Sequence, residues 1–323
     1  MKLKILLLTI VVSFLSVLSV FIVLQDSKNQ GKMDSILNQT SQAYLGYSEK
    51  DILNKAAFIL PVAESNYLPF RDWNILEPDV GVKAGAVFDT HSGKFLFQKN
   101  LKTKLPIASI TKLLTAAVII ENIELDSIVF IPQEAMNVDH EGGEDFFLNE
   151  SFFARDLLRA MLIKSSNDAA VAFQIFAKEK GMDLIELINK KSADIGMVNS
   201  KFYDPAGLDD RGYSTAEDLV KLVGYIKRYP EVENILITKN VKIRSVDGRF
   251  EHELDSTDKL LGVIPDIEAG KTGNTDEALG TMILRINLPG YDSSLIGVIL
   301  GSNDRFSDMK KIIEWAKIAY RWK

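Results

Sequence analysis

Two kinds of hydrophobic pattern divide the chain into strand-like and helix-like regions. Residues 84–89 and 94–99 read as two strands, with the turn residues His91, Ser92 and Gly93 between them. Residues 280–288 and 293–303 read as two further strands, joined through Pro289, Gly290 and Tyr291, and a helix is predicted from about Ser307 to Trp322. Because strands come from both ends of this region, the pattern predicts one sheet built from segments far apart in the sequence.

The region between those strands has helical periodicity. Residues 113–120 are almost wholly apolar, which predicts a helix buried nearly all round. Residues 149–181 read as two helices broken at 165–167. Apolar stripes mark both helices, and Asp168 suits the start of the second. The stripe residues are Leu157, Leu158, Met161 and Leu162 in the first helix, and Ala169, Ala172, Phe173 and Phe176 in the second.

The N-terminal part is organised differently. Residues 5–24 form an apolar run that would span about 30 Å as a helix, the thickness of a bilayer core. Lys2 and Lys4 before it favour a cytoplasmic N-terminus. We expect three parts: a membrane anchor at 1–24, a linker at 25–78 with one short helix near 49–60, and a globular domain at 79–323. A cleaved signal peptide is the alternative for residues 1–24, and either reading places the domain outside the cytoplasm.

Composition removes several classes of function. The chain has no cysteine, so the domain rests on its core without disulfides. Its net charge of −6 argues against nucleic acid as a partner. Its three histidines, His91, His140 and His252, are scattered. We therefore expect neither a metal site nor a cofactor, and a Ser-His-Asp triad is disfavoured.

Three short motifs occur in an order that suggests shared chemistry: S-x-x-K at 109–112, S-x-N at 165–167 and K-T-G at 271–273. Each is weak alone, since S-x-x-K also occurs at 256–259 and 307–310. Alone, the first would be a helix cap followed by a lysine that reaches water, the second an interhelical turn capped by its asparagine, and the third a turn before a strand. A P-loop is excluded because its first glycine position is Pro265.

The residue types fit nucleophilic catalysis. A serine hydroxyl attacks only when a base removes its proton, and Lys112 lies one helical turn after Ser109, on the same face. Lysine can serve as that base if burial or a second cation lowers its pKa from the ordinary value of ~10.4. The start of the helix also favours negative charge developing on Ser109.

The motifs and their flanks resemble the low-molecular-mass penicillin-binding proteins, in particular the D-alanyl-D-alanine carboxypeptidases of the S11 peptidase family. The similarity covers about residues 80–323. It is carried by "LPIASITKLLTA", "DLLRAMLIKSSNDAA", "FYDPAGLDDRGYSTAEDL" and "GKTGNTDEALG". The resemblance implies an α+β fold: a five-stranded antiparallel sheet flanked by helices, with an all-helical subdomain. It also implies a peptidoglycan stem peptide ending in D-Ala-D-Ala as substrate, and β-lactam antibiotics as ligands.

The resemblance also implies roles for the motif residues. Ser109 would be the nucleophile and Lys112 its base. Ser165 would relay a proton to the leaving amine, while Asn167 would hold Lys112 and the substrate amide. Lys271 and Thr272 would bind the terminal carboxylate, Gly273 would let substrate approach the strand, and the N–H groups of Ser109 and Asn274 would form the oxyanion hole.

Three alternatives remain open at this stage. A D,D-endopeptidase would use the same site. A class A β-lactamase would need a glutamate in a loop between the second and third motifs; Glu186 and Asn189 have the wrong spacing, in a stretch that looks helical. The third is a non-catalytic peptidoglycan-binding module. The chain also departs from the family at three positions: Ser166 and Asn274 change the polarity of the cleft and so bear on substrate preference, and Leu279 shifts the end of a strand.

Overall fold

The computed structural model describes residues 69–136 and 146–322. The apolar run at 5–24 and the helix predicted near 49–60 lie outside the described residues, so both stay predictions. Within the described ranges, no helix is both long enough and apolar enough to span a bilayer.

A single five-stranded antiparallel sheet forms the centre of the domain, as predicted. Its strand order is β3-β2-β10-β9-β8. All four pairings are antiparallel. Every residue of the middle strand β10 is buried, whereas β8 is an edge strand. The strands are β2 (Ala84–Asp89), β3 (Lys94–Lys99), β8 (Ile267–Thr275), β9 (Leu279–Asn287) and β10 (Ser294–Ser302).

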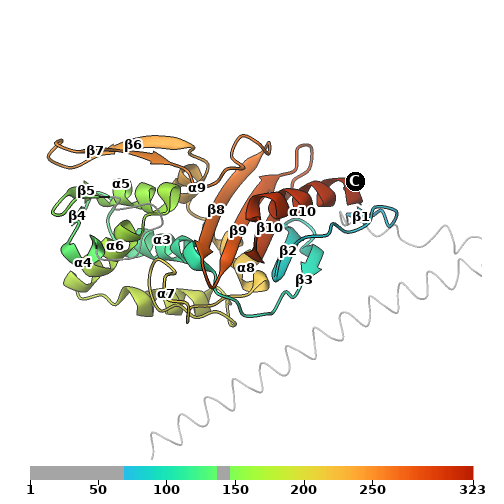
Figure 1. Ribbon diagram of the computed structural model, residues 1–323, viewed down its shortest axis with the longest axis horizontal. Helices are drawn as coiled ribbons and strands as arrows, with labels where there is room; N and C mark the ends of the chain where they lie inside the picture. The colour runs from blue at the N-terminus through green and yellow to red at the C-terminus, as the bar shows by residue number, and fades with distance from the viewer. Residues whose placement is uncertain (1–68, 137–145, 323) are drawn as a thin grey trace, which may run out of the picture. The chain divides into compact units, whose positions relative to one another are not determined.

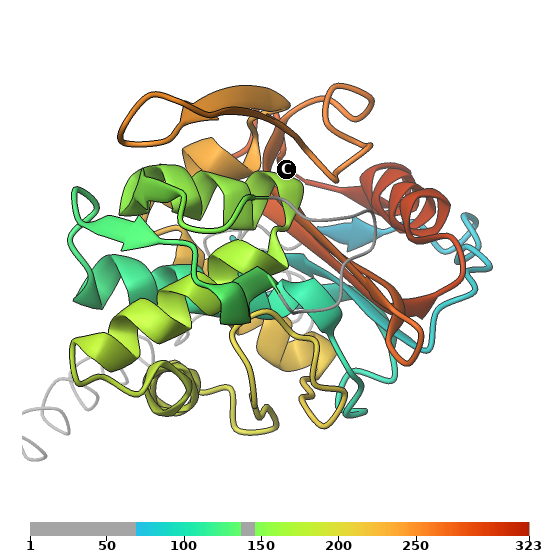
Figure 2. The same ribbon diagram turned by 60° about the vertical axis from the view of Figure 1, so that its left-hand side comes forward.

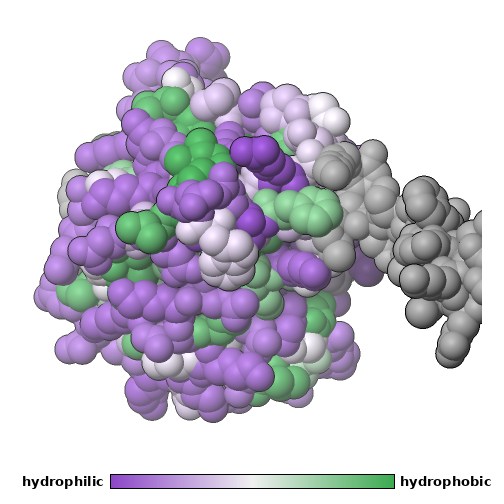
Figure 3. Space-filling model, turned by 90° about the vertical axis from the view of Figure 1, so that its right-hand side faces the viewer, coloured by the Kyte–Doolittle hydropathy of each residue, from purple (hydrophilic) through white to green (hydrophobic). Residues whose placement is uncertain are grey.

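Both faces of the sheet are covered. Helix α10 (Arg305–Ala319) packs on one face and α8 (Ala216–Ile226) contacts β2, β9 and β10. The C-terminal helix ends earlier than the sequence predicts, because β11 (Tyr320–Arg321) pairs with β1 (Phe70–Arg71). Residues assigned to the linker thus contribute to the domain. Figure 3 shows the face on this side of the molecule as mainly hydrophilic, with separate apolar groups.

Helices gather beside the β8 edge of the sheet (Figures 1 and 2). Helix α3 is the most deeply placed, with every residue from Thr111 to Ile119 buried. The helices of this part are α3 (Thr111–Asn122), α4 (Gln133–Met136), α5 (Ala154–Arg159), a π-helix (Ala160–Lys164), α6 (Asn167–Glu179) and α7 (Leu184–Asp194). A hairpin of β4 (Ile128–Phe130) and β5 (Ser151–Phe153) joins them.

A second covering element lies between this helical part and the sheet. Helix α9 (Pro230–Leu236) contacts both β8 and the π-helix. It is followed by a hairpin of β6 (Asn240–Arg244) and β7 (Glu251–Asp255). Residues 256–266 connect β7 to β8, and the K-T-G motif enters the sheet next to the helical part.

Candidate active site

Ser109 lies in a 3-10 turn, Ala108–Ile110, that leads into α3. Neither helix start has a side-chain cap bond, so Ser109 does not cap the helix. Lys112 follows one turn later and is fully buried, with 0% of its surface exposed. The reading of this motif as a helix cap and a water-exposed lysine is therefore wrong.

The Lys112 amine is surrounded by acceptors. Its Nζ lies 2.7 Å from Ser109 Oγ, 2.7 Å from Asn167 Oδ1 and 3.0 Å from the carbonyl oxygen of Ala206. An ammonium group has three N–H donors, so each can meet one acceptor, which reduces the free-energy cost of burying the charge. In the neutral form, the lone pair of the same nitrogen can take the Ser109 proton.

The S-x-N motif lies where the π-helix ends. Ser165 has a positive φ of 63°, which turns the chain sharply. The Ser166 hydroxyl accepts a hydrogen bond of 3.2 Å from Ala169 N and caps α6. The reading of Asn167 as the cap is thus wrong. Because Ser166 does the capping, the Asn167 side chain is available to Lys112.

The K-T-G motif lies within β8 rather than before a strand. Lys271 Nζ donates to Ser165 Oγ at 2.7 Å and to the carbonyl oxygen of Thr272 at 2.9 Å. Lys271 is buried, with 1% of its surface exposed. Thr272 donates its hydroxyl to Thr257 at 2.7 Å. The structure therefore brings the three motifs together as two serine–lysine pairs, Ser109 with Lys112 and Ser165 with Lys271.

The second lysine has an unusual electrostatic environment. Burial lowers the pKa of Lys271 well below its usual range, and the charges of Lys112 and Arg305 lower it further. The carboxyl of Asp258 acts in the opposite direction. Repulsion between the two motif lysines therefore contributes to the lowered pKa of Lys271.

Gly273 is required by close packing against the nucleophile. A Cβ atom there would lie 2.5 Å from Thr281 Oγ1 and 2.9 Å from the backbone nitrogen of Ser109. The glycine thus lets β8 lie against the turn that carries Ser109, a reason different from the substrate approach that the resemblance implies. Asn274 follows on the same strand, and the oxyanion hole assigned to the N–H groups of Ser109 and Asn274 stays a prediction.

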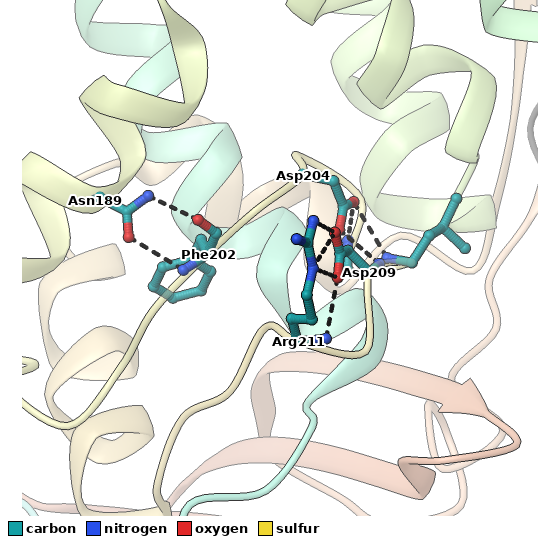
Figure 4. A network of polar contacts seen from close by, with 7 residues as sticks. Asn189, Phe202, Asp204, Asp209 and Arg211 are labelled. Atoms are coloured by element: carbon teal, nitrogen blue, oxygen red, sulfur yellow. Dashed lines mark hydrogen bonds and ion pairs between the residues drawn. The ribbon is translucent and has the colours of Figure 1, made fainter.

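The loop at 204–209 contacts Lys112 through the Ala206 carbonyl. Figure 4 shows the hydrogen bonds of Asp204 within this loop. The Asp204 carboxylate accepts four backbone N–H bonds of 2.6–3.1 Å, from Ala206, Gly207, Leu208 and Asp209. These bonds fix the turn that presents the Ala206 carbonyl to Lys112. Gly207 has φ +82°, and a Cβ atom there would lie 1.9 Å from the Ala108 carbonyl oxygen, so the loop packs directly on the nucleophile's turn.

The residues considered for a β-lactamase lie elsewhere. Glu186 is in the first turn of α7, so this stretch is helical as predicted. The Asn189 amide donates to the Phe202 carbonyl at 2.8 Å and accepts from Phe202 N at 3.1 Å (Figure 4). The Asn189 amide thus ties α7 to the segment leading into the Asp204 loop, and neither Glu186 nor Asn189 provides the loop glutamate of a β-lactamase.

Sequence reasoning missed several residues next to the motifs. Arg305, at the start of α10, donates to Asn274 Oδ1 at 3.3 Å. Thr257 and Asp258 lie beside β8, and both fall within the S-x-x-K match at 256–259. Asp204 carried a usable signal, since an aspartate two residues before Ala206-Gly207 is typical of a side chain that folds back on a turn.

We expect Asp204→Asn to weaken the site without touching the motif residues. The asparagine amide has only one acceptor oxygen, and its NH2 group would face backbone N–H donors. Some of these N–H groups would therefore lose their hydrogen bonds, which should lower the free energy of unfolding by about 1–3 kcal/mol. Misplacement of the Ala206 carbonyl should slow acylation by roughly 10–100-fold. Time-resolved mass spectrometry with benzylpenicillin measures this rate.

Asp183→Asn is the matched control. Asp183 also accepts two backbone N–H bonds of 3.0 Å, from Ile185 and Glu186, but at the exposed N-terminus of α7. It should change stability slightly and acylation not at all. Equal acylation rates for Asp204→Asn and the wild type would contradict the role given to the loop.

This geometry is that of a serine acyl-transfer enzyme in which lysines take the place of a histidine base. One hydroxyl is bonded to a buried lysine at the start of a helix, and a second hydroxyl is bonded to a lysine of a sheet-edge strand. Residues 74–304 match the D-alanyl-D-alanine carboxypeptidase family, peptidase family S11, and the chain belongs to this family.

Individual relatives agree with that assignment. The chain is 27% identical to the D-alanyl-D-alanine carboxypeptidase DacF of Bacillus subtilis over 74% of its own length, and spans 62% of that protein. It is 31% identical to a D-alanyl-D-alanine endopeptidase of Haemophilus influenzae, with 61% of this chain and 68% of that protein covered. Relatives of both activities therefore lie at comparable distance.

Solved structures share the fold. Penicillin-binding protein D2 of Listeria monocytogenes, in its cefotaxime-bound form, has a TM-score of 0.65 and 27% identity, covering 75% of this chain and 99% of that one. The Streptomyces K15 DD-transpeptidase has a TM-score of 0.68 at 23% identity, covering 76% and 100%. The predicted fold class, a transpeptidase-like sheet with a helical subdomain, is confirmed.

Proposed function

We propose that the protein is a serine D-Ala-D-Ala carboxypeptidase that removes the terminal D-alanine from peptidoglycan stem peptides through an ester on Ser109. The observation that carries this proposal is the pairing of Ser109 with the fully buried Lys112 at 2.7 Å, in a chain of the S11 family. Penicillins acylate the same serine, because they present a strained amide and a carboxylate to the same groups.

The reaction proceeds in two balanced steps. Neutral Lys112 takes the Ser109 proton while Oγ bonds to the carbonyl carbon of the penultimate D-alanine. The C–N bond then breaks, and the departing amine of the terminal D-alanine takes up this proton from Lys112 by way of Ser165. In the second step, water adds to the ester, its proton returns by way of Lys112, and Ser109 is released as the hydroxyl.

The terminal carboxylate of the substrate is placed at Lys271 and Thr272. A cation and a hydroxyl suit this group, and a bound carboxylate offsets the repulsion between Lys271 and Lys112. Since β8 is an edge strand, an extended peptide can pair with its free side. The oxyanion in this proposal lies at the N–H groups of Ser109 and Asn274.

Residues 1–24 are proposed as the anchor that holds the catalytic domain on the outer side of the cytoplasmic membrane. Support comes from the sequence: an apolar run at 5–24 that follows Lys2 and Lys4. A secreted form, with this segment removed, is the alternative outcome. Protease accessibility of the domain in intact cells and N-terminal sequencing of the isolated protein separate these outcomes.

The function is tested with the full-length protein and two substrates. Release of D-alanine from a stem pentapeptide ending in D-Ala-D-Ala, measured by chromatography, supports the carboxypeptidase. Cleavage of a cross-linked dimer without release of D-alanine would establish the endopeptidase instead, the activity named for the Haemophilus influenzae relative. Turnover of benzylpenicillin would indicate a β-lactamase. No reaction with any of these substrates would leave only a binding module.

The role of Lys271 gives a separate prediction. In Lys271→Ala, kcat/KM for a peptide with a free terminal carboxylate should fall by about 10–100-fold, the loss of one charge-assisted hydrogen bond of ~1.5–3 kcal/mol. The same peptide with an amidated terminus should lose much less, because it has no charge to bind.

Lys259→Ala is the control for that variant, since Lys259 is an exposed lysine beside the same strand. It should leave both rates unchanged. An equal loss on the free and the amidated peptide in Lys271→Ala would count against Lys271 as the group that binds the carboxylate.

A further inference from the structure

The segment at 256–266, between β7 and β8, contacts two of the catalytic motifs. Thr257 N donates to the Ile163 carbonyl at 3.1 Å, two residues before Ser165. Thr257 Oγ1 accepts the hydroxyl of Thr272 at 2.7 Å. The segment therefore links the end of the π-helix to the K-T-G strand, and Asp258 is the next residue along it.

The Asp258 carboxyl is buried, with 5% of the residue exposed. Its Oδ1 accepts the Leu260 N–H at 2.8 Å. Its Oδ2 is buried and has no hydrogen-bond partner among the described residues. A Cβ atom on Gly270 would lie 2.2 Å from this oxygen, so the carboxyl lies against the β8 backbone one residue before Lys271. A side chain at position 270 would therefore displace the carboxyl from this place.

A buried acceptor without a partner is costly, and it calls for a compensating interaction. Lys271 is the neighbouring cation. The charged groups acting on Lys271 are Lys112 from α3, Arg305 from α10 and Asp258, and only Asp258 favours the protonated lysine. Conversely, burial raises the pKa of the Asp258 carboxyl, and the Lys271 charge offsets part of that rise. The two groups are therefore coupled through space.

We propose that Asp258 is a positioning residue of the carboxylate subsite, whose buried negative charge holds the proton on Lys271 against the repulsion of Lys112 and Arg305. The proposal rests on the proposed function for its substrate, a peptide or β-lactam with a free carboxylate. It adds that Asp258 sets the pH range over which that carboxylate is bound.

The sign of the effect follows from the two charges. As the pH rises, Lys271 loses its proton, and binding of the substrate carboxylate weakens. The negative charge of Asp258 shifts this deprotonation of Lys271 to higher pH. When the charge of Asp258 is removed, Lys271 loses its proton at a lower pH. The alkaline limb of kcat/KM should then shift to lower pH by about one unit. As the pH falls through the raised pKa of Asp258, the carboxyl is neutralised, and its help to Lys271 ends there.

The test compares Asp258→Asn with the wild type in the full-length protein. The second-order rate of acylation by benzylpenicillin is measured from pH 6 to 10, and benzylpenicillin methyl ester serves as the probe without a carboxylate. The alkaline limb for the acid should move down, with a rate loss of roughly 5–10-fold at pH 9. The rate for the ester should be unchanged. An unshifted alkaline limb, or equal losses for acid and ester, would overturn the proposal.

Asp89→Asn is the matched control. Asp89 is a buried carboxyl (0% exposed) at the end of β2, bonded to Ser92 and Ser293. It should not move the pH profile. Asp258→Ser is a second variant that removes the charge and keeps an acceptor for the Leu260 N–H; it should shift the limb as Asp258→Asn does.

If both Asp258 variants fail to fold, carbon-13 NMR of the wild type decides. Titration of the Asp258 carboxyl carbon should then be mirrored in the Lys271 Cε shift, and independent titrations would overturn the proposal. Failure of the proposed function is a different result, because penicillin acylation would persist without D-alanine release from the stem peptide.

Discussion

Ser109→Ala should abolish the formation of a penicillin adduct and reduce D-alanine release by about 10⁴–10⁶-fold. The hydroxyl oxygen is the atom that forms the ester, and its partner Lys112 has no other hydroxyl among its three acceptors at 2.7–3.0 Å. Mass spectrometry of the intact protein after incubation with benzylpenicillin measures the adduct, and peptide mapping locates it.

Ser307→Ala is the control for this experiment. Ser307 begins another S-x-x-K match, but it lies in the first turn of α10, where its backbone N–H is capped by Asp304. The Ser307→Ala variant should form the penicillin adduct in the same yield as the wild type. A penicillin adduct of normal yield on Ser109→Ala would refute the assignment of the nucleophile.

Lys112→Met should slow acylation by roughly 10²–10⁴-fold while leaving the fold intact. Methionine fills a similar volume and removes both the base and a buried charge. Because the Asn167 and Ala206 oxygens then lose their donor, stability should fall by about 1–3 kcal/mol at most. The acylation rate from stopped-flow or quenched mass spectrometry gives the first effect, and urea unfolding gives the second.

Lys310→Met provides the comparison, since Lys310 completes the motif of Ser307 but its side chain is 47% exposed and pairs with Glu314 on the surface. It should change neither quantity appreciably, because exposed ion pairs contribute little. Wild-type acylation by Lys112→Met would mean that another group removes the Ser109 proton.

Much of the sheet could be predicted from local pattern. The strands at 84–89 and 94–99 flank the turn residues His91, Ser92 and Gly93, and Pro289 and Gly290 separate the C-terminal strands. These features act within a few residues, so the sequence alone reveals them. The end of the last helix was not visible in this way, because β11 forms only where β1 supplies its partner strand.

The motif residues were predictable as a set because their order and setting in the chain are unusual. Their individual roles were not separable from commoner readings, since a serine before a helix is usually a cap. The structure excludes the capping interpretation, because Lys112 is fully buried (0% exposed) and Ser109 makes no cap bond. Catalysis is the interpretation of the pair that remains.

The sequence by itself thus determined the family, four of the five sheet strands and the pairing of Ser109 with Lys112. It could do so because periodicity, turn residues and motif order are local or sequential properties. Only the tertiary structure decided which groups surround the lysines. The resemblance implied Asn167, but the Ala206 carbonyl, Arg305 and Asp258 reach the lysines from three other parts of the chain. Charge and burial depend on distances across the fold, and no local pattern records those distances.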